Sequence, residues 1–315
     1  MLRPSFRPLL RLLPASLPVL ALLAVLAPMA QARAESVVER AARTGELVLA
    51  GSPDMPPLLS LDAQGQLQGY GVLVAGTIQA QLSAAVGRPL KLRFQPISDP
   101  AALGQSLAEG KVDLACGVPF SWERDMTVDY TLPIALSGLR LLAPAGRFDG
   151  SPAALAGRRI GVVANSLAET ELRGMQPAAV AVRFPNLAAA FKALQAGQVQ
   201  GVIGDTLLLA NQARAAGAQG LALTPDLPYE RYAVACALPE NDSAFRNLAN
   251  LAIAQLLQGY VDGQPEAVAA VDRWVGPSSS LRLSQAQIRT YFETVLLGVE
   301  AIRPLPVAAG SSSAR

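Results

Sequence analysis

The chain has 315 residues, a formal net charge of +2 and no histidine. This length is sufficient for two lobes with separate hydrophobic cores, and the hydrophobic content of 51% indicates a folded chain. The weak net charge, without a Lys/Arg-rich run, excludes the electrostatic surface typical of nucleic-acid-binding proteins. The missing histidine excludes Ser-His-Asp and Cys-His catalysis and histidine-containing zinc sites, so we expect no catalytic residues, no metal ion and no cofactor.

Residues 1–34 have the pattern of a secretory signal peptide. Three arginines among the first eleven residues precede an apolar run at 17–27, and Ala-Arg-Ala at 32–34 fits the small-residue cleavage pattern. The alternative is an uncleaved membrane anchor, but Pro18 interrupts the run, which is shorter than the roughly 20 residues that a span needs. We expect cleavage before Glu35 and a location in the periplasm.

Strand and helix patterns alternate along the remaining chain. The first part predicts strands at 47–50, 90–94 and 112–117 and helices at 72–86 and 101–108. After a turn at 146–150, the alternation resumes with strands at 160–163, 180–184 and 199–203 and helices at 167–175, 187–195 and 206–216. The last part predicts a strand at 232–237 and helices at 243–258, 265–274 and 284–299. This alternation indicates an α/β protein with mostly parallel sheets and helices on their faces.

A weak internal repeat supports two related lobes. Each copy has a helix, a glycine turn and a strand that ends at a second glycine. The four positions of the first copy recur 87 residues later: Leu107, Gly110, Val112 and Gly117 match Leu194, Gly197, Val199 and Gly204.

Two cysteines, Cys116 and Cys236, each lie in a short apolar run that predicts a buried strand. An exported protein is in a compartment where disulfides form, so the two could be paired. Two separate buried thiols are the alternative, and the sequence leaves both open.

Several short motifs occur in a characteristic order. They are Gly-Glu-Leu-Val-Leu at 45–49, Met-Pro-Pro at 55–57 followed by Gly-Tyr at 69–70, Glu-Arg at 123–124 followed by Val-Asp-Tyr-Thr-Leu-Pro at 128–133, Leu-Ala-Gly-Arg-Arg-Ile-Gly-Val at 155–162, and Gly-Gln-Val at 197–199 with Asp205. In this order the motifs resemble the family-3 extracellular solute-binding proteins, whose best-known members bind polar amino acids for import. The resemblance covers about residues 45–276.

This resemblance implies a two-lobed periplasmic-binding-protein fold of type II, with a mostly parallel sheet flanked by helices in each lobe and a two-strand hinge. Lobe 1 would comprise residues 35–141 plus 232–300, and lobe 2 residues 142–231. The sequence at 301–315 predicts a disordered tail. The helix at 284–299 lies beyond the usual end of the family, and we expect it to pack on lobe 1 rather than to serve a partner.

Three polar residues match ligand positions of the family. The resemblance implies that Arg124 pairs with a ligand carboxylate, whereas a surface ion-pair cluster with its neighbours Glu123 and Asp125 is the alternative. Asp205 would receive an ammonium group or, alternatively, cap the helix that follows it. Ser166 would bind an anionic group with the free N–H groups of its helix, or be a plain N-cap.

Aromatic residues could form apolar walls around a ligand. Tyr70 and Phe120 are the candidates, together with Trp122, and the alternative is that they lie in the core or at the rim. The chain also departs from the amino-acid binders of the family at several ligand positions. These departures are Met55, Gly71, Leu73, Pro119 and Gln200.

The resemblance implies a monomer that binds a small polar, carboxylate-bearing solute, amino-acid-like in kind, and delivers it to an ABC permease. The departures leave room for an orphan or accessory protein without a transport role. A periplasmic dehydratase of the cyclohexadienyl type, which has a related fold, would need an acid that faces the leaving hydroxyl. Glu169 and Glu171 are the acids near the Ser166 turn, and both resemble ordinary first-turn helix acids, so we expect a binding protein and not an enzyme.

Overall fold

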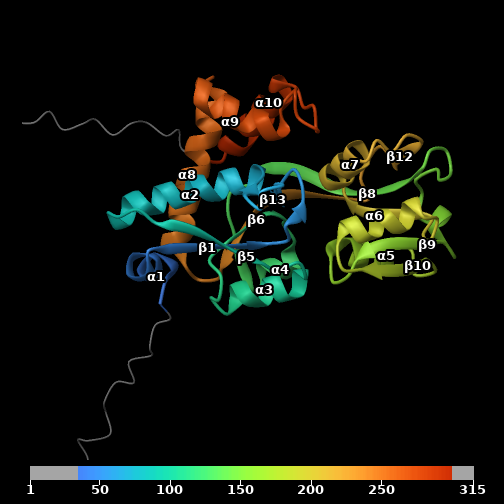
Figure 1. Cartoon of the computed structure of the whole chain (residues 1–315), viewed down its shortest axis with the longest axis horizontal. Coiled ribbons are helices and arrows are strands. Elements are labelled where there is room, and N and C mark those ends of the chain that lie inside the picture. Colours follow the sequence, from blue (N-terminus) through green and yellow to red (C-terminus); the bar gives the residue numbers. More distant parts are fainter. Residues whose placement is uncertain (1–34, 300–315) are drawn as a thin grey trace, which may run out of the picture. The chain divides into compact units, whose positions relative to one another are not determined.

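The computed structural model describes residues 35–299. The predicted signal peptide at 1–34 and the predicted tail at 301–315 lie outside the described residues. The described residues from Ser36 onward belong to one compact unit, in which two lobes can be distinguished (Figure 1). Of the helices within 35–299, none combines the length and the apolar character that a membrane span requires.

Lobe 1 contains the first and last parts of the chain. Its helices are α1 (Val37–Thr44), α2 (Tyr70–Val86), α3 (Pro100–Ala108), α4 (Trp122–Asp125), α8 (Ser243–Val261), α9 (Pro265–Val275) and α10 (Gln285–Leu296). Its strands are β1 (Glu46–Gly51), β2 (Asp54–Met55), β3 (Leu59–Leu61), β4 (Leu67–Gln68), β5 (Lys91–Pro96), β6 (Ala115–Pro119) and β7 (Val128–Tyr130). Strands β1 and β5 are parallel, β2–β4 form a small antiparallel sheet, and a parallel bridge from Leu49 to Leu114 joins β1 to the segment before β6.

Lobe 2 is built from the middle of the chain. Its elements are the 3₁₀ helix η2 (Pro152–Leu155), strands β9 (Arg159–Val163), β10 (Val180–Phe184), β11 (Gly201–Asp205) and β12 (Leu221–Thr224), and helices α5 (Leu167–Met175), α6 (Leu187–Gln195) and α7 (Thr206–Ala215). Strand β9 lies between β10 and β11 and is parallel to both. This is the βαβ arrangement that the alternating pattern predicts.

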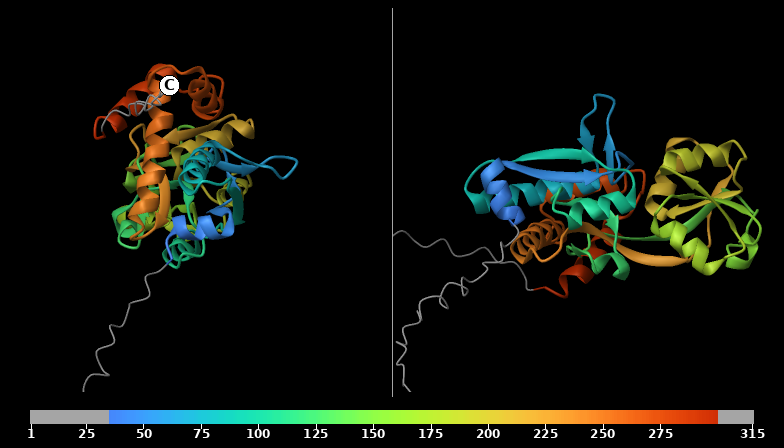
Figure 2. Two further views of the ribbon diagram at one scale, coloured as in Figure 1. Left: turned by 90° about the vertical axis from the view of Figure 1, so that its left-hand side faces the viewer. Right: turned by 90° about the horizontal axis from the view of Figure 1, so that it is seen from below.

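Two long strands, β8 (Ala135–Pro144) and β13 (Glu230–Pro239), connect the lobes (Figures 1 and 2). The first half of β8 pairs with the first half of β13. The second half of β8 pairs with β11 and β12 of lobe 2, and the second half of β13 pairs with β6 and β7 of lobe 1. These two strands therefore join strands of both lobes into one eight-stranded sheet, and the predicted two-strand hinge is confirmed. The lobe boundaries at 141 and 231 stay a proposal.

The internal repeat corresponds to the same turn in each lobe. Gly110, after α3, has a φ of 65°, and Gly197, after α6, has a φ of 69°. Each glycine N–H donates to the carbonyl three residues earlier, that of Leu107 or Leu194. A positive φ is accessible to glycine without steric cost, so this residue lets the chain reverse from a helix into the strand that follows.

The hydrophobic interior is partly shared by the lobes. The largest cluster runs from lobe 1 through Leu139, Leu141 and Tyr232 on the hinge strands to Ile203 in β11. A second cluster, around Phe191 of α6, lies within lobe 2. The two lobes therefore do not have wholly separate cores, because the hinge strands carry buried side chains from one lobe into the other.

Cys116 and Cys236 form a disulfide bond. They lie in β6 and β13, which are neighbouring antiparallel strands, and the two residues are opposite each other in the register. The alternative of two separate thiols is thereby excluded. The bond lies within lobe 1 and fastens one hinge strand to that lobe.

The predicted C-terminal helix is present as α10, with a capping box between Ser284 and Gln287. Its buried face carries Ile288 and Phe292, and the Phe292 ring packs edge-on against Tyr260 of α8, with 5.2 Å between the ring centroids. The helix therefore packs on lobe 1, as expected.

Candidate functional site

A cleft of about 620 Å³ opens between the lobes. Lobe 1 contributes residues of β2, α3, β6 and α4, and lobe 2 contributes the ends of β9 and β11 with the first turns of α5, α6 and α7. The volume lies in the range of small-molecule sites. The strand ends are where open α/β sheets bind ligands.

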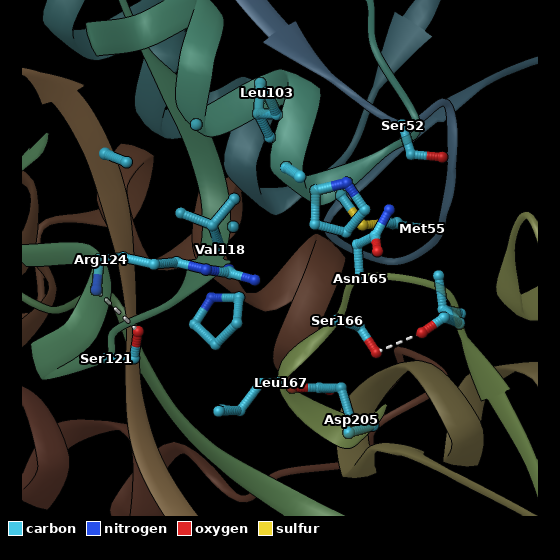
Figure 3. A pocket seen from close by; sticks show the side chains of 18 of the residues that line it. Ser52, Met55, Leu103, Val118, Ser121, Arg124, Asn165, Ser166, Leu167 and Asp205 are labelled. Atoms are coloured by element: carbon cyan, nitrogen blue, oxygen red, sulfur yellow. Dashed lines mark hydrogen bonds between the residues drawn. The ribbon is translucent and has the colours of Figure 1, made fainter. Parts of the chain in front are cut away.

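Arg124 projects from α4 into this cleft (Figure 3). The short helix is fixed by Ser121, whose Oγ accepts a hydrogen bond of 3.3 Å from the Arg124 N–H. Among the ion pairs of residues 35–299 there is none that involves Arg124, so the predicted alternative of a cluster with Glu123 and Asp125 is not formed. The guanidinium lies near Tyr130, where burial raises the pKa of the phenol and the positive charge lowers it.

Asp205 lines the cleft from lobe 2, at the end of β11. Its Oδ1 accepts hydrogen bonds from the N–H groups of Leu207 at 2.8 Å and Leu208 at 3.1 Å, which makes it the N-cap of α7. Its Oδ2 accepts a bond of 2.7 Å from the Tyr232 hydroxyl. Burial raises the pKa of Asp205, although the hydrogen bonds from Tyr232 and Leu208 lower it. Both oxygens of this carboxylate are therefore already bound within the protein.

Ser166 also lines the cleft and caps a helix (Figure 3). Its Oγ accepts a hydrogen bond from the Glu169 N–H at 3.4 Å and donates one to the Val163 carbonyl at 2.6 Å. The hydroxyl proton is thus used within lobe 2. The N-cap interpretation accounts for this residue without a ligand.

Tyr70 and Phe120 do not lie on the lining of the cleft. Tyr70 is 1% exposed at the start of α2, and its hydroxyl donates to the Ile134 carbonyl at 3.0 Å, so the side chain faces the core. Phe120 packs edge-on against Trp122 and Tyr130, each at 5.0 Å between ring centroids, and Trp122 is 78% exposed. The prediction that these aromatics form the ligand walls does not match their positions, because each ring packs against lobe 1 itself.

The match to known proteins agrees with this geometry. The model of the bacterial extracellular solute-binding proteins, family 3, matches residues 47–271. The chain belongs to this family. The match spans both lobes and both hinge strands, including the whole cleft lining.

Three proteins similar to this solute-binding protein are 20–24% identical to it. A probable histidine-binding protein of Neisseria gonorrhoeae is 24% identical over 215 residues, which cover 66% of this chain and 76% of that protein. The crystal structure of the solute receptors for L-cysteine of the same organism has a TM-score of 0.66 at 22% identity, and the match covers 77% of this chain and 94% of that one. An ancestral amino-acid-binding protein described as a precursor of cyclohexadienyl dehydratase also has a TM-score of 0.66, at 20% identity, over 76% of this chain and 100% of that one. At these identities, the structural likeness establishes the fold alone.

Two hydrogen bonds join the lobes of this solute-binding protein at the cleft. The Asn165 amide donates to Asp99 at 2.7 Å, and the Asn186 amide donates to Asp54 at 3.2 Å. In both, lobe 2 provides the asparagine and lobe 1 the aspartate. Sequence reasoning missed them, although three of the four residues lie where a strand or loop gives way to a helix, the same type of position as Ser166. We refer to these two bonds as the Asn–Asp latch.

The acids near the Ser166 turn do not face the cleft. Glu169 is buried, and its carboxylate pairs with Arg173 and Arg183 and accepts a hydrogen bond of 2.7 Å from the Asn165 N–H. Glu171 does not line the cleft. Within residues 35–299, no group of three or more acidic or cysteine side chains is placed to hold a metal ion.

Proposed function

We propose that this solute-binding protein captures a small carboxylate-bearing solute, of amino-acid size, in the cleft between its lobes. The observation that carries the proposal is the Arg124 guanidinium, which projects into the cleft and has no ion-pair partner among residues 35–299. A guanidinium presents paired donors that match the two oxygens of a carboxylate.

Capture would couple to lobe closure. The strands β8 and β13 allow one lobe to rotate toward the other, and the ligand contacts residues of both. A ligand that binds the closed state more tightly than the open state shifts the population toward closure. The Asn–Asp latch adds two bonds that are specific to lobes in contact.

The exported location is part of the same proposal. The signal-peptide pattern at 1–34 and the extracellular character of the family support a monomer that works in the periplasm and hands its ligand to an ABC permease. An orphan or accessory role without a permease is the alternative, which the departures at Met55 and Pro119 favour.

Binding without chemical turnover is supported by the acids of the site. A dehydratase needs a carboxylic acid within reach of the leaving hydroxyl. Glu169 is held by two arginines, and Glu171 is off the lining. Asp205 has both oxygens engaged in hydrogen bonds.

A thermal-shift screen tests the proposal. Purified protein is melted with amino acids, organic acids, amines and uncharged sugars, each in excess. A ligand at a hundred times its Kd stabilises the folded state by about 2.7 kcal/mol, which raises Tm by roughly 5–10 °C in a domain of this size. We expect stabilisation by carboxylates that is absent in Arg124→Gln.

The matched control for this screen is Arg214→Gln. Arg214 is exposed in lobe 2 and does not line the cleft, so this variant makes the same substitution away from the proposed site. This variant should respond to carboxylates as the wild type does. Stabilisation by sugars or amines alone would contradict the proposed function, as would a carboxylate response that persists in Arg124→Gln.

A further inference from the structure

The polar and apolar parts of the cleft are unevenly distributed. Four charged side chains line it among the described residues: Asp54, Glu123, Arg124 and Asp205. An α-amino acid brings one negative and one positive group, and each needs a partner when it leaves water. The state of the three carboxylates therefore determines which kind of carboxylate ligand the site accepts.

Asp205 is the carboxylate best placed to meet an ammonium group, since it is half-buried across the cleft from Arg124 (Figure 3). It already accepts three hydrogen bonds, two from the first turn of α7 and one from the Tyr232 hydroxyl. Burial raises its pKa, so the site already disfavours the charged form of this group. A carboxylate has about four acceptor sites, so these three internal hydrogen bonds leave an ammonium about one of them.

The other two carboxylates are exposed to solvent. Asp54 accepts the Asn186 amide in the Asn–Asp latch, and Glu123 lies beside Arg124 on α4. Exposed carboxylates remain hydrated and give an ammonium little net attraction. Neither carboxylate can therefore take the place of Asp205 as an ion-pair partner that is shielded from water.

Apolar side chains form part of the lining near the guanidinium. Figure 3 labels Met55, Leu103, Val118 and Leu167 among the lining residues, together with the uncharged polar side chains of Ser121, Asn165 and Ser166. Pro119 also lines the cleft, and a proline has neither an N–H donor nor a hydroxyl. Such walls favour an apolar ligand body, and they offer no ionic partner to a charged group on that body.

From this distribution we infer that the preferred ligand is a monocarboxylate with an apolar body and no ammonium group, such as an aryl-substituted or branched aliphatic acid. The inference rests on the proposed function, since Arg124 holds the carboxylate. The body then lies among the apolar side chains, toward Leu167. Asp205 remains the cap of α7 and takes no part in recognition.

Titration calorimetry with matched ligand pairs tests the inference. The pairs are 3-phenylpropanoate with L-phenylalanine, and 4-methylpentanoate with L-leucine, whose members differ only by the ammonium group. We expect at least one acid to bind about tenfold or more tightly than its amino acid, the factor for a polar group left unpaired. Methyl 3-phenylpropanoate, which lacks the carboxylate, should not bind.

The variant Asp205→Asn makes the test independent of ligand choice. Asparagine is an equally good N-cap, so α7 is retained, while the negative charge is removed. If Asp205 is only a cap, the affinity for the acids stays within about threefold of wild type or rises. A melting curve of the variant verifies its fold.

The outcomes separate the inference from the proposed function. If the amino acids bind more tightly than the acids, and Asp205→Asn and Arg124→Gln both weaken them, the inference is overturned while carboxylate capture stands. If the methyl ester binds as well as the acid, or if neither member of either pair binds at millimolar concentration, both are contradicted.

Discussion

The two lobes differ in whether the polar side chains that they contribute to the cleft are already bound within the protein. Lobe 1 offers Arg124, a charged side chain on a short exposed helix, with no ion pair in the described chain. Lobe 2 offers Asp205, Ser166 and Asn186, and each of them caps a helix. A polar residue at the end of a strand is therefore not by itself a recognition residue. The charged side chain that has no ion-pair partner in the described chain is the better candidate.

The lobes also differ in how they are held together. Lobe 1 contains the disulfide and the long helices α2 and α8, whereas lobe 2 relies on its smaller cluster and on the hinge strands. The arginine therefore sits on the lobe with the additional covalent link. This contrast between the lobes leads to four predictions, ordered by the size of the expected effect.

The disulfide should have the largest effect on stability. It links residues 120 positions apart, and the chain-entropy model gives about 4–5 kcal/mol for a loop of that order. We expect Cys116→Ala with Cys236→Ala to lower the urea midpoint of unfolding strongly. Added reductant should lower the wild-type midpoint and leave the variant unchanged. Equal midpoints for the wild type and the double variant in the absence of reductant would show that the disulfide does not stabilise lobe 1.

Breaking the Asn–Asp latch should loosen the contact between the lobes. Asn165→Gly suits the positive φ of 58° at that position, and Asp54→Ala leaves every helix cap intact. Two exposed hydrogen bonds at about 0.5–1.5 kcal/mol each should make the double variant bind its ligand roughly tenfold more weakly. Small-angle scattering of the free protein should detect more open particles. Lys192→Ala, an exposed change in lobe 2, is the control. Unchanged affinity and scattering would mean that the latch does not affect closure.

A variant of Ser166 can distinguish helix capping from ligand recognition within lobe 2. Ser166→Ala should lower the free energy of unfolding by about 1 kcal/mol through the lost N-cap of α5, with ligand affinity within about twofold. Denaturant unfolding and calorimetry on the same sample measure both quantities. A large loss of affinity at constant stability would reassign the hydroxyl to the ligand.

The raised pKa of Asp205 predicts a pH dependence of stability. A carboxyl whose folded-state pKa lies above its unfolded value binds a proton more readily when folded. Its ionisation therefore destabilises the protein above the folded pKa, and this cost disappears as pH falls through the folded pKa toward the unfolded value near 3.9. Asp205→Asn removes the ionisable group, so it should raise Tm by a few degrees at pH 7 and by less at pH 4. Melting curves of both proteins at the two pH values measure this, and an equal difference at both would contradict the assignment.

Much of the fold could be predicted from periodicity, and the exceptions have physical causes. The helices α2, α5, α6 and α8 end near the predicted residues. Strand β8 was missed because it is buried by both lobes along most of its length, which removes the alternation that marks a strand. Strands β2–β4 are two or three residues long and depend on their sheet partners. Helix α1 was missed despite the capping box of Ser36 and Glu39.

The candidate site was only partly predictable for a different reason. Motif order identified Arg124, Asp205 and Ser166, and all three line the cleft. Tyr70 was misplaced because the rotation of α2 on the core determines which way its first residue points. The disulfide and the Asn–Asp latch depend on register and on contacts between distant segments, which one sequence does not reveal.

The central claim is that lobe 1 binds the ligand carboxylate through Arg124, whereas the polar groups of lobe 2 are already hydrogen-bonded within the protein. The most direct test is the affinity for one carboxylate hit, measured by calorimetry on Arg124→Gln and Asp205→Asn side by side. We predict a loss of about 100-fold or more for Arg124→Gln, equivalent to about 2.7 kcal/mol, and a change within about threefold for Asp205→Asn. A larger loss in Asp205→Asn than in Arg124→Gln would contradict this division between the lobes.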